Sequence, residues 1–242
     1  MLKTIDFWAN VEDWSAIIIT IIVIIIGLYR FRKITFPSQL LLFTIIVGFA
    51  ANKTMDVFHA RHMSDHVLLY INYLNDFIIG SMFFNYSIPQ FRKIKLGIYM
   101  GAAGFVFWAM YSSFIAPMAF DAGNESYFYY ASFFDLCCIV FSLIGLYLMF
   151  QESTFAEIRR NEVFWYFIIY IFGDGIGFIY DIVITMVRSE TVFTIASILL
   201  EYLPNSLSVL FLGCLFLRYP KKADAVVGQL FITDARFKTE CH

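Results

Sequence analysis

Seven apolar stretches, each about as long as a bilayer requires, follow one another along the chain. A spanning helix needs roughly 20 predominantly apolar residues. Hydrophobic residues make up 60% of the 242 residues and charged residues only 15%, whereas a soluble domain carries about 25% charged residues. We therefore expect an all-α integral membrane protein, a bundle of seven transmembrane helices. The expected spans are about 14–31, 38–60, 66–88, 96–116, 127–150, 163–187 and 193–218.

The connections between these stretches are short, so we expect neither a linker nor a second domain. Three of the five prolines, Pro37, Pro89 and Pro220, lie at expected span ends, where a residue without a backbone N–H is tolerated. We expect residues 1–220 to form the transmembrane domain and residues 221–242 to form a short cytoplasmic tail. A tail of this length is too short for an enzymatic output domain, so we expect no enzyme activity.

Lysine and arginine residues divide unequally between the two sets of loops. Cytoplasmic loops carry the excess of these residues, so we expect the N-terminus outside and the C-terminus inside a plasma or cytoplasmic membrane. The net charge of −2 provides no basic field for nucleic acid. The richer side holds Arg30, Arg32, Lys33, Arg92, Lys93, Lys95, Arg159, Arg160, Arg218, Lys221 and Lys222, and the other side holds Lys3, Arg61 and Arg188.

Ionisable residues inside the apolar spans are the first candidates for function. A charge within the bilayer is costly and normally faces the bundle interior or water. Asp181 is a few residues from Arg188, so we expect it at a wetted span end, whereas Asp135, Asp174 and Glu201 are deeper. The full set is Lys53, Asp56, Asp76, Asp135, Asp174, Asp181 and Glu201.

Lys53 and Asp56 are three residues apart, so they share one face of a helix. An amine and a carboxylate at this spacing neutralise each other. A buried pair is weak evidence of stability, because the cost of desolvation offsets the Coulomb attraction. We therefore interpret the pair as holding a specific arrangement of the chain.

Three of the four histidines, His59, His62 and His66, lie in the stretch HARHMSDH. His62 and His66 have the i,i+4 spacing at which two side chains on one helix face share a metal ion. The stretch is the expected outer turn between the second and third spans, where a helix breaks. We therefore interpret these histidines as solvated interfacial residues and only as weak candidates for metal ligands.

Short motifs in the expected spans match, in order along the chain, the motifs of one family. The matching stretches are Asp13–Trp14 before an apolar run that ends in GLYRF, YINYL (70–74), GAAG (101–104), YYAS (129–132), RN (160–161) before FIIYI (167–171), and EYLPN (201–205). Together with seven spans and an outer N-terminus, they resemble the microbial (type 1) rhodopsins. The resemblance covers the whole bundle and implies a rhodopsin-like fold.

The chain departs from this family at the positions that matter for its chemistry. The lysine that holds retinal as a Schiff base is matched by Asn205, and the primary carboxylate counterion by Asn72. The secondary counterion is matched by Glu201, which is still acidic. The arginine before the third-span motif is matched by Leu69 and the proton donor falls near Phe83. The resemblance therefore does not imply a standard outward proton pump.

The stretch NKTMD in the second span resembles the family segment that lies beside the Schiff base, so Lys53 keeps an amine near the usual place. Two explanations follow. In the first, Lys53 is a relocated retinal lysine with Asp56 or Glu201 as counterion. In the second, Lys53 is only a charge partner and no covalent chromophore binds. On this alignment, one point of the bundle is surrounded by Asn52, Lys53, Asp56, Asn72, Glu201 and Asn205.

The chromophore pocket that the resemblance implies is only partly kept. Aromatic side chains remain at Tyr73, Tyr130, Phe167 and Tyr170, but Asp174 stands where a tryptophan would pack against the polyene. A carboxylate against a hydrocarbon chain is unfavourable unless it is neutral or paired. We therefore favour the second explanation, in which retinal is possible but no covalent chromophore is expected.

Three functions remain open. The first is an opsin-like sensory, transducing or adaptor protein that acts through a membrane or cytoplasmic partner. The second is a retinal-binding photoreceptor or a light-driven or light-gated ion transporter with its Schiff base on Lys53. The third is a light-independent cation or proton channel or transporter that uses the intramembrane acids, since Asn72 and Asp76 lie one turn apart and suit an ion path. The lipid bilayer is an expected partner, and homo-oligomers are common in the resembling family.

Overall fold

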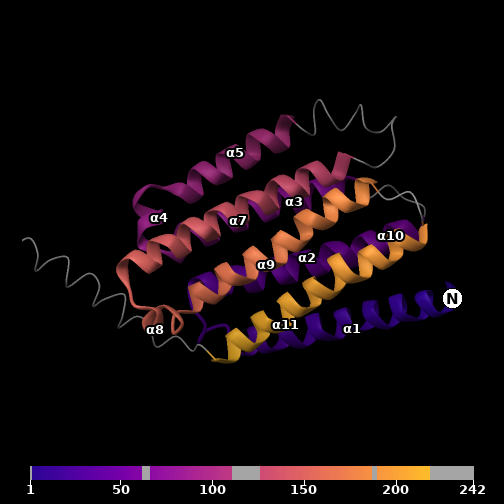
Figure 1. Cartoon of the computed structure of the whole chain (residues 1–242), viewed down its shortest axis with the longest axis horizontal. Helices are drawn as coiled ribbons and strands as arrows, with labels where there is room; N and C mark the ends of the chain where they lie inside the picture. Colours follow the sequence, from indigo (N-terminus) through magenta and orange to yellow (C-terminus); the bar gives the residue numbers. More distant parts are fainter. Residues whose placement is uncertain (1, 62–65, 111–125, 187–189, 219–242) are drawn as a thin grey trace, which may run out of the picture.

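The structure, a computed structural model, describes residues 2–61, 66–110, 126–186 and 190–218. These residues are mostly helical and contain no strand, which confirms the all-α prediction. The long helices lie side by side (Figure 1). They are α1 (Leu2–Tyr29), α2 (Phe36–Ala60), α3 (His66–Ser87), α5 (Leu96–Met110), α7 (Ser126–Glu152), α9 (Glu162–Met186) and α11 (Leu203–Arg218). The short elements are α4 (Pro89–Lys93), α8 (Phe155–Ile158), α10 (Glu190–Ala196) and the π-helical turn η2 (Ser197–Tyr202).

Four helical segments among the described residues are long and apolar enough to cross a membrane. Inside a bilayer a helix is favoured, because it satisfies its own backbone hydrogen bonds where no water is present. Two shorter apolar stretches, Trp14–Tyr29 and Leu96–Phe107, accompany them. The protein is therefore a membrane protein by helix length and composition. The four segments are Phe36–Phe58, Ser132–Gln151, Glu162–Val183 and Val192–Arg218.

Local signals in the sequence explain where several helices end. Pro89 occupies the first turn of α4, where a missing N–H costs nothing. Thr154 and Glu157 form a capping box at the start of α8. In the last long helical segment, Pro204 has no N–H to donate to the carbonyl of Leu200, and the turn before it is π-helical.

The helices pack in the order of the chain and the last returns to the first. Helix α2 contacts α1 and α3, α3 contacts α5 and α7, and α7 contacts α9. Helix α9 contacts η2 and α11, and α11 packs along α1. The described helices therefore enclose a common interior (Figure 1).

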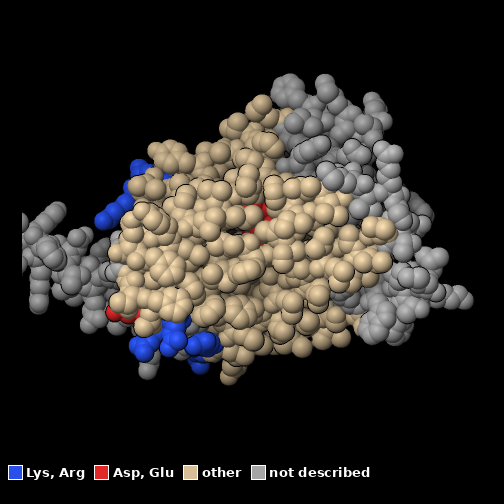
Figure 2. Space-filling view, in the orientation of Figure 1, with Lys and Arg blue, Asp and Glu red and all other residues tan. Residues whose placement is uncertain are grey.

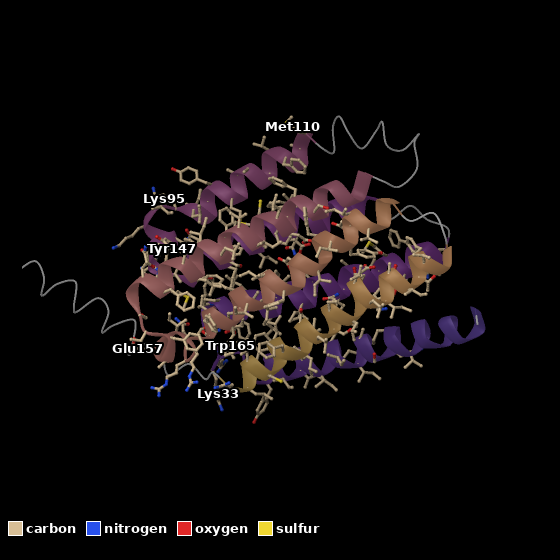
Figure 3. All side chains as sticks on the ribbon, in the orientation of Figure 1. Lys33, Lys95, Met110, Tyr147, Glu157 and Trp165 are labelled. Carbon is tan, nitrogen blue, oxygen red and sulfur yellow. The ribbon has the colours of Figure 1, made fainter. Side chains whose placement is uncertain are left out.

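One end of the bundle carries the basic residues, and we call it the basic end. Lys33, Lys95, Glu157 and Trp165 all lie there, and Met110 lies at the opposite end (Figure 3). The middle of the surface in view is almost uncharged (Figure 2). Many large apolar side chains of the described helices are exposed, as expected of helices that face lipid. The basic residues at or beside the helix ends on this side are Arg30, Arg32, Lys33, Arg92, Lys93, Lys95, Arg159, Arg160 and Arg218.

Aromatic rings fill the half of the interior nearer the basic end. Phe83 and Phe84 of α3 are fully buried and pack against Phe167 of α9. Phe91 of α4 contacts both Phe84 and Phe167. The absence of a side chain at Gly145 of α7 makes room for the Phe167 ring, which a β-carbon at residue 145 would overlap. We call the four phenylalanines the aromatic seal, because they close the interior towards the basic end.

Candidate acidic site

Three aspartates from three helices meet in the interior: Asp76 of α3, Asp135 of α7 and Asp174 of α9. We call them the acid cluster. Counted from the helix ends opposite the basic end, each lies about 14 to 18 Å deep at about 1.5 Å per residue. This depth is about half the thickness of a bilayer's hydrocarbon core, which is about 30 Å. An unpaired charge at such a depth in a membrane is costly.

The interactions within the acid cluster are mainly electrostatic ones between carboxyl groups. Asp135 interacts electrostatically with Asp174, Asp181 and Asp76. The thiol of Cys138 on α7 hydrogen-bonds Asp174. In the described part of the chain, the electrostatic interactions of these three aspartates involve no lysine or arginine. Carboxylates so placed repel one another when they are ionised, so the acid cluster is suited to sharing protons.

Several polar atoms around the acid cluster lack a protein partner. Asn72 Nδ2 of α3 donates to Asp76 Oδ2 at 3.5 Å, the limit of a hydrogen bond. Asn72 Oδ1, Asn75 Nδ2 and Asp174 Oδ2 are buried without a hydrogen bond to any described residue. Buried polar atoms of this kind normally bond to water or to an ion. Acidic atoms are also visible at the bottom of an opening in the middle of the uncharged surface (Figure 2).

Gly177 of α9 brings α7 close enough for the acid cluster to form. A β-carbon at residue 177 would lie 2.9 Å from Asp135 Oδ2, closer than real β-carbons approach such an atom. Gly177 belongs to the stretch GDGIG (173–177), which also contains Asp174. Glycine at this position therefore lets the Asp135 carboxyl group lie directly against the backbone of α9.

A second polar group extends from the acid cluster towards the end opposite the basic end. Ser132 Oγ of α7 donates to Asp181 Oδ2 at 2.7 Å. The hydroxyl groups of Tyr180 and Ser197 are 3.1 Å apart, and Tyr180 also hydrogen-bonds Glu201. Glu201 and Asp181 interact electrostatically. Polar side chains therefore connect the acid cluster with η2 and with the half of α9 that lies away from the basic end.

The position of Asp181 corrects an expectation. We expected it at a wetted span end, but its side chain is buried with only 7% exposed. The hydrogen bond from Ser132 and the close packing of α7 on α9 explain the difference. Asp181 belongs to the polar interior rather than to the surface.

The residues that were predicted to surround one point of the bundle lie in different places in the structure. Lys53 Nζ and Asp56 Oδ2 form an ion pair at 2.7 Å, with 39% and 61% of the side chains exposed. Lys53 is seven residues from the end of α2 and therefore about 10 Å from it. Asn52 and Asn205 are exposed. Asn72 contacts the acid cluster instead, and Glu201 contacts Tyr180, as described above.

The predicted chromophore pocket is occupied by packed rings where the structure describes it. Tyr170 packs against Phe83 and Phe84, with ring centroids 5.2 and 5.6 Å apart, and Phe167 is part of the aromatic seal. Asp174 belongs to the acid cluster. The side chains of Tyr73 and Tyr130 lie outside the described residues.

The interpretation of the three histidines as interfacial residues and weak metal-ligand candidates stays a prediction. The side chains of His59, His62 and His66 lie outside the described residues. Within the described ranges, no group of three or more histidine, cysteine or acidic residues is arranged to hold a metal ion.

Sequence reasoning missed several members of this site: Cys138, Ser132, Gly177, Tyr180 and Ser197. A signal for Gly177 was present, because three glycines alternate around an intramembrane aspartate in GDGIG. Small residues next to an acid in a span indicate a close helix approach. The serines and the cysteine carry no such signal, since only the packing of α7 on α9 brings them to the carboxyl groups.

No family model, no curated protein and no solved structure matches the chain. The likeness to microbial rhodopsins thus stays a resemblance of short motifs. The geometry of the acid cluster carries the functional argument.

Proposed function

We propose that this protein moves protons or other small cations across its membrane through the acid cluster, in the dark and without a covalent chromophore. The observation that carries the proposal is the convergence of Asp76, Asp135 and Asp174 from α3, α7 and α9 without a described basic partner. Carboxyl groups that share protons within a membrane are suited to ion transfer. This is the third of the functions left open by the sequence.

The two halves of the interior support this proposal because they differ in polarity. From the acid cluster towards the outer end, Asp181, Ser132, Tyr180 and Glu201 provide hydrogen-bonding groups. Towards the basic end the aromatic seal closes the interior. A site that is polar on one side and closed on the other is what a gated transfer pathway requires, because access from both sides at once would be a leak.

The proposed bundle has seven spans with the N-terminus outside, resembling microbial rhodopsins. The order of helix contacts, in which α11 returns to α1, supports a closed bundle of this kind. The concentration of lysine and arginine at the basic end supports a cytoplasmic location for that end.

The geometry around Lys53 favours the explanation without a Schiff base. The Lys53 amine forms an ion pair with the Asp56 carboxylate at 2.7 Å, and formation of a Schiff base would break this pair. A Schiff base requires the neutral amine as nucleophile. We therefore propose that Lys53 is a charge partner.

Ion flux in proteoliposomes tests the proposed function. The parent protein should dissipate an imposed pH or cation gradient in the dark, faster than empty liposomes. Asp174→Asn and Asp135→Asn should lower this flux about tenfold or more, because each removes a group that exchanges a proton or cation. The matched control is Asp56→Asn, the same chemical change at an exposed residue outside the acid cluster, which should leave the flux unchanged.

Two results would overturn the proposal. One is a parent protein with no more flux than empty liposomes, which would favour the sensory or adaptor function. The other is a flux that Asp174→Asn and Asp135→Asn leave at the parent level.

A further inference from the structure

Four oxygen-bearing side chains recur at every fourth residue along α9: Glu162, Tyr166, Tyr170 and Asp174. Residues at i and i+4 are neighbours on a helix surface, so such a series forms one inclined row. The row begins at the basic end and ends at the acid cluster. It therefore runs through the region that the aromatic seal occupies, and we call it the α9 row.

At the basic end, the first members of the α9 row belong to a buried hydrogen-bonded network. Glu162 is buried, and Ser38 Oγ at the start of α2 donates to its Oε2 at 3.1 Å. The Tyr166 hydroxyl is 2.6 Å from Ser38 Oγ, and Tyr166 also hydrogen-bonds Glu162. Thr35 donates a further hydrogen bond to Glu162. The first two members of the row are therefore already joined through oxygen atoms.

At its other end, the α9 row reaches the acid cluster through Tyr170. Its phenol interacts electrostatically with Cys138, Asp174 and Asp76. Tyr166 and Tyr170 both pack against the Phe83 ring, at 6.0 and 5.2 Å between centroids. The two tyrosines thus bring hydroxyl groups into the packing around Phe83, where the other described rings are phenylalanines.

We propose that the ion transferred is the proton, and that it crosses the aromatic seal along the α9 row. This inference rests on the proposed function and names its substrate. A hydrated metal cation needs a continuous polar opening, whereas the described rings are packed against one another. A proton needs only oxygen atoms that accept one proton and release another.

The transfer balances at every oxygen atom. For inward transfer, Asp174 gives its proton to the Tyr170 oxygen as the Tyr170 O–H proton passes towards Tyr166. Tyr166 gives its own proton through the Ser38 hydroxyl to the Glu162 carboxylate, which releases it at the basic end. Only O–H bonds form and break, and rotation of the hydroxyl groups restores the row. Tyr170 and Tyr166 are one helical turn apart, about 6 Å along the helix axis, so this step requires a water molecule between the two hydroxyl groups.

Tyrosine-to-phenylalanine variants test the α9 row, because they remove the hydroxyl and keep the ring. In dark proteoliposomes with a pH gradient, Tyr166→Phe and Tyr170→Phe should each lower proton flux about tenfold or more. The control is Tyr147→Phe on α7, where the hydroxyl accepts a hydrogen bond from exposed Gln151 outside the row. This variant should keep the parent flux. A sodium gradient without a pH gradient should drive no flux in any variant. Gel-filtration profiles and melting temperatures check that each variant is folded.

The flux measurements distinguish failure of the α9 row from failure of the proposed function. Parent flux in Tyr166→Phe and Tyr170→Phe, together with loss of flux in Asp174→Asn, would overturn the α9 row and leave the proposed function standing. Sodium flux as fast as proton flux would also overturn the row. Absence of any flux in the parent would overturn both proposals.

Discussion

Gly177 of α9 faces the carboxyl group of Asp135 on α7, and a β-carbon at residue 177 would lie 2.9 Å from Asp135 Oδ2. The acid cluster therefore depends on a backbone surface as well as on three acidic side chains. The close packing of α7 on α9 places the Asp135 carboxyl group against the backbone at residue 177. A single methyl group at residue 177 should disturb the site more than it disturbs the fold.

Gly177→Ala should move the Asp135 carboxyl group and lower ion flux about tenfold, while the stability of the protein changes by no more than about 1 kcal/mol. The stability change is small because the displaced atoms are the end of one side chain and alanine favours the helix. Gly175→Ala is the matched control, since a β-carbon there meets nothing within 4 Å. Flux in proteoliposomes and thermal unfolding in detergent measure the two effects. Equal flux in both variants would contradict the role given to Gly177.

The positions of the helices could largely be predicted from the sequence. The expected spans 38–60, 127–150 and 163–187 correspond to α2, α7 and α9 within about two residues at each end. Long apolar runs bounded by charge or proline fix such bounds. The π-helical turn within the expected span 193–218 was not predicted, although Pro204 was its signal.

The directions in which side chains point could not be predicted. Helices that are apolar on most sides give no periodicity to show which face is inward. Lys53 was therefore placed at the centre of the bundle, whereas the structure pairs it with Asp56 on an exposed part of α2. For the same reason Asp174 was treated as part of a chromophore pocket, and its contact with Asp135 and Cys138 emerged only from the packing of α7 on α9.

Addition of all-trans retinal should produce no visible pigment band in the parent protein or in Lys53→Ala. The Lys53 amine is occupied by Asp56, and packed rings fill the described part of the predicted pocket. Absorption spectra before and after borohydride treatment measure pigment formation. A band present in the parent and absent in Lys53→Ala would establish the relocated Schiff base.

The basic end should be cytoplasmic. Ser153→Cys places a thiol at an exposed residue of the basic end, between α7 and α8, and Arg61→Cys places one just beyond the end of α2. A membrane-impermeant maleimide added to intact cells should label Arg61→Cys, and Ser153→Cys only after permeabilisation. Labelling of the parent measures the reaction of its native cysteines. The reverse labelling pattern would contradict the proposed orientation.

The capping box of α8 should make the stability of the protein depend on pH through the carboxyl group of Glu157. The backbone N–H of Thr154 and then its hydroxyl group donate to Glu157 Oε2, each at 3.0 Å, and lower the pKa of that carboxyl group. A folded-state pKa below the unfolded value contributes stability above the unfolded value and loses it as the pH falls through the folded value.

Thr154→Ala removes one of these bonds, so the pKa of Glu157 should rise towards its ordinary value. Titration of the Glu157 carboxyl carbon by NMR measures this change, with Ser153→Ala as the neighbouring control. An identical pKa in the parent and in Thr154→Ala would show that the hydroxyl group does not contribute.

Labelling with a membrane-soluble carbodiimide tests the central claim most directly, because this reagent modifies carboxyl groups that carry a proton within the membrane. If Asp76, Asp135 and Asp174 share protons, mass spectrometry of the labelled protein should find the modification on the acid cluster. Exposed Asp56, paired with Lys53, should stay unmodified. Modification of the acid cluster should also stop ion flux in the same sample. An acid cluster that stays unmodified, or flux that continues after its modification, would contradict the account.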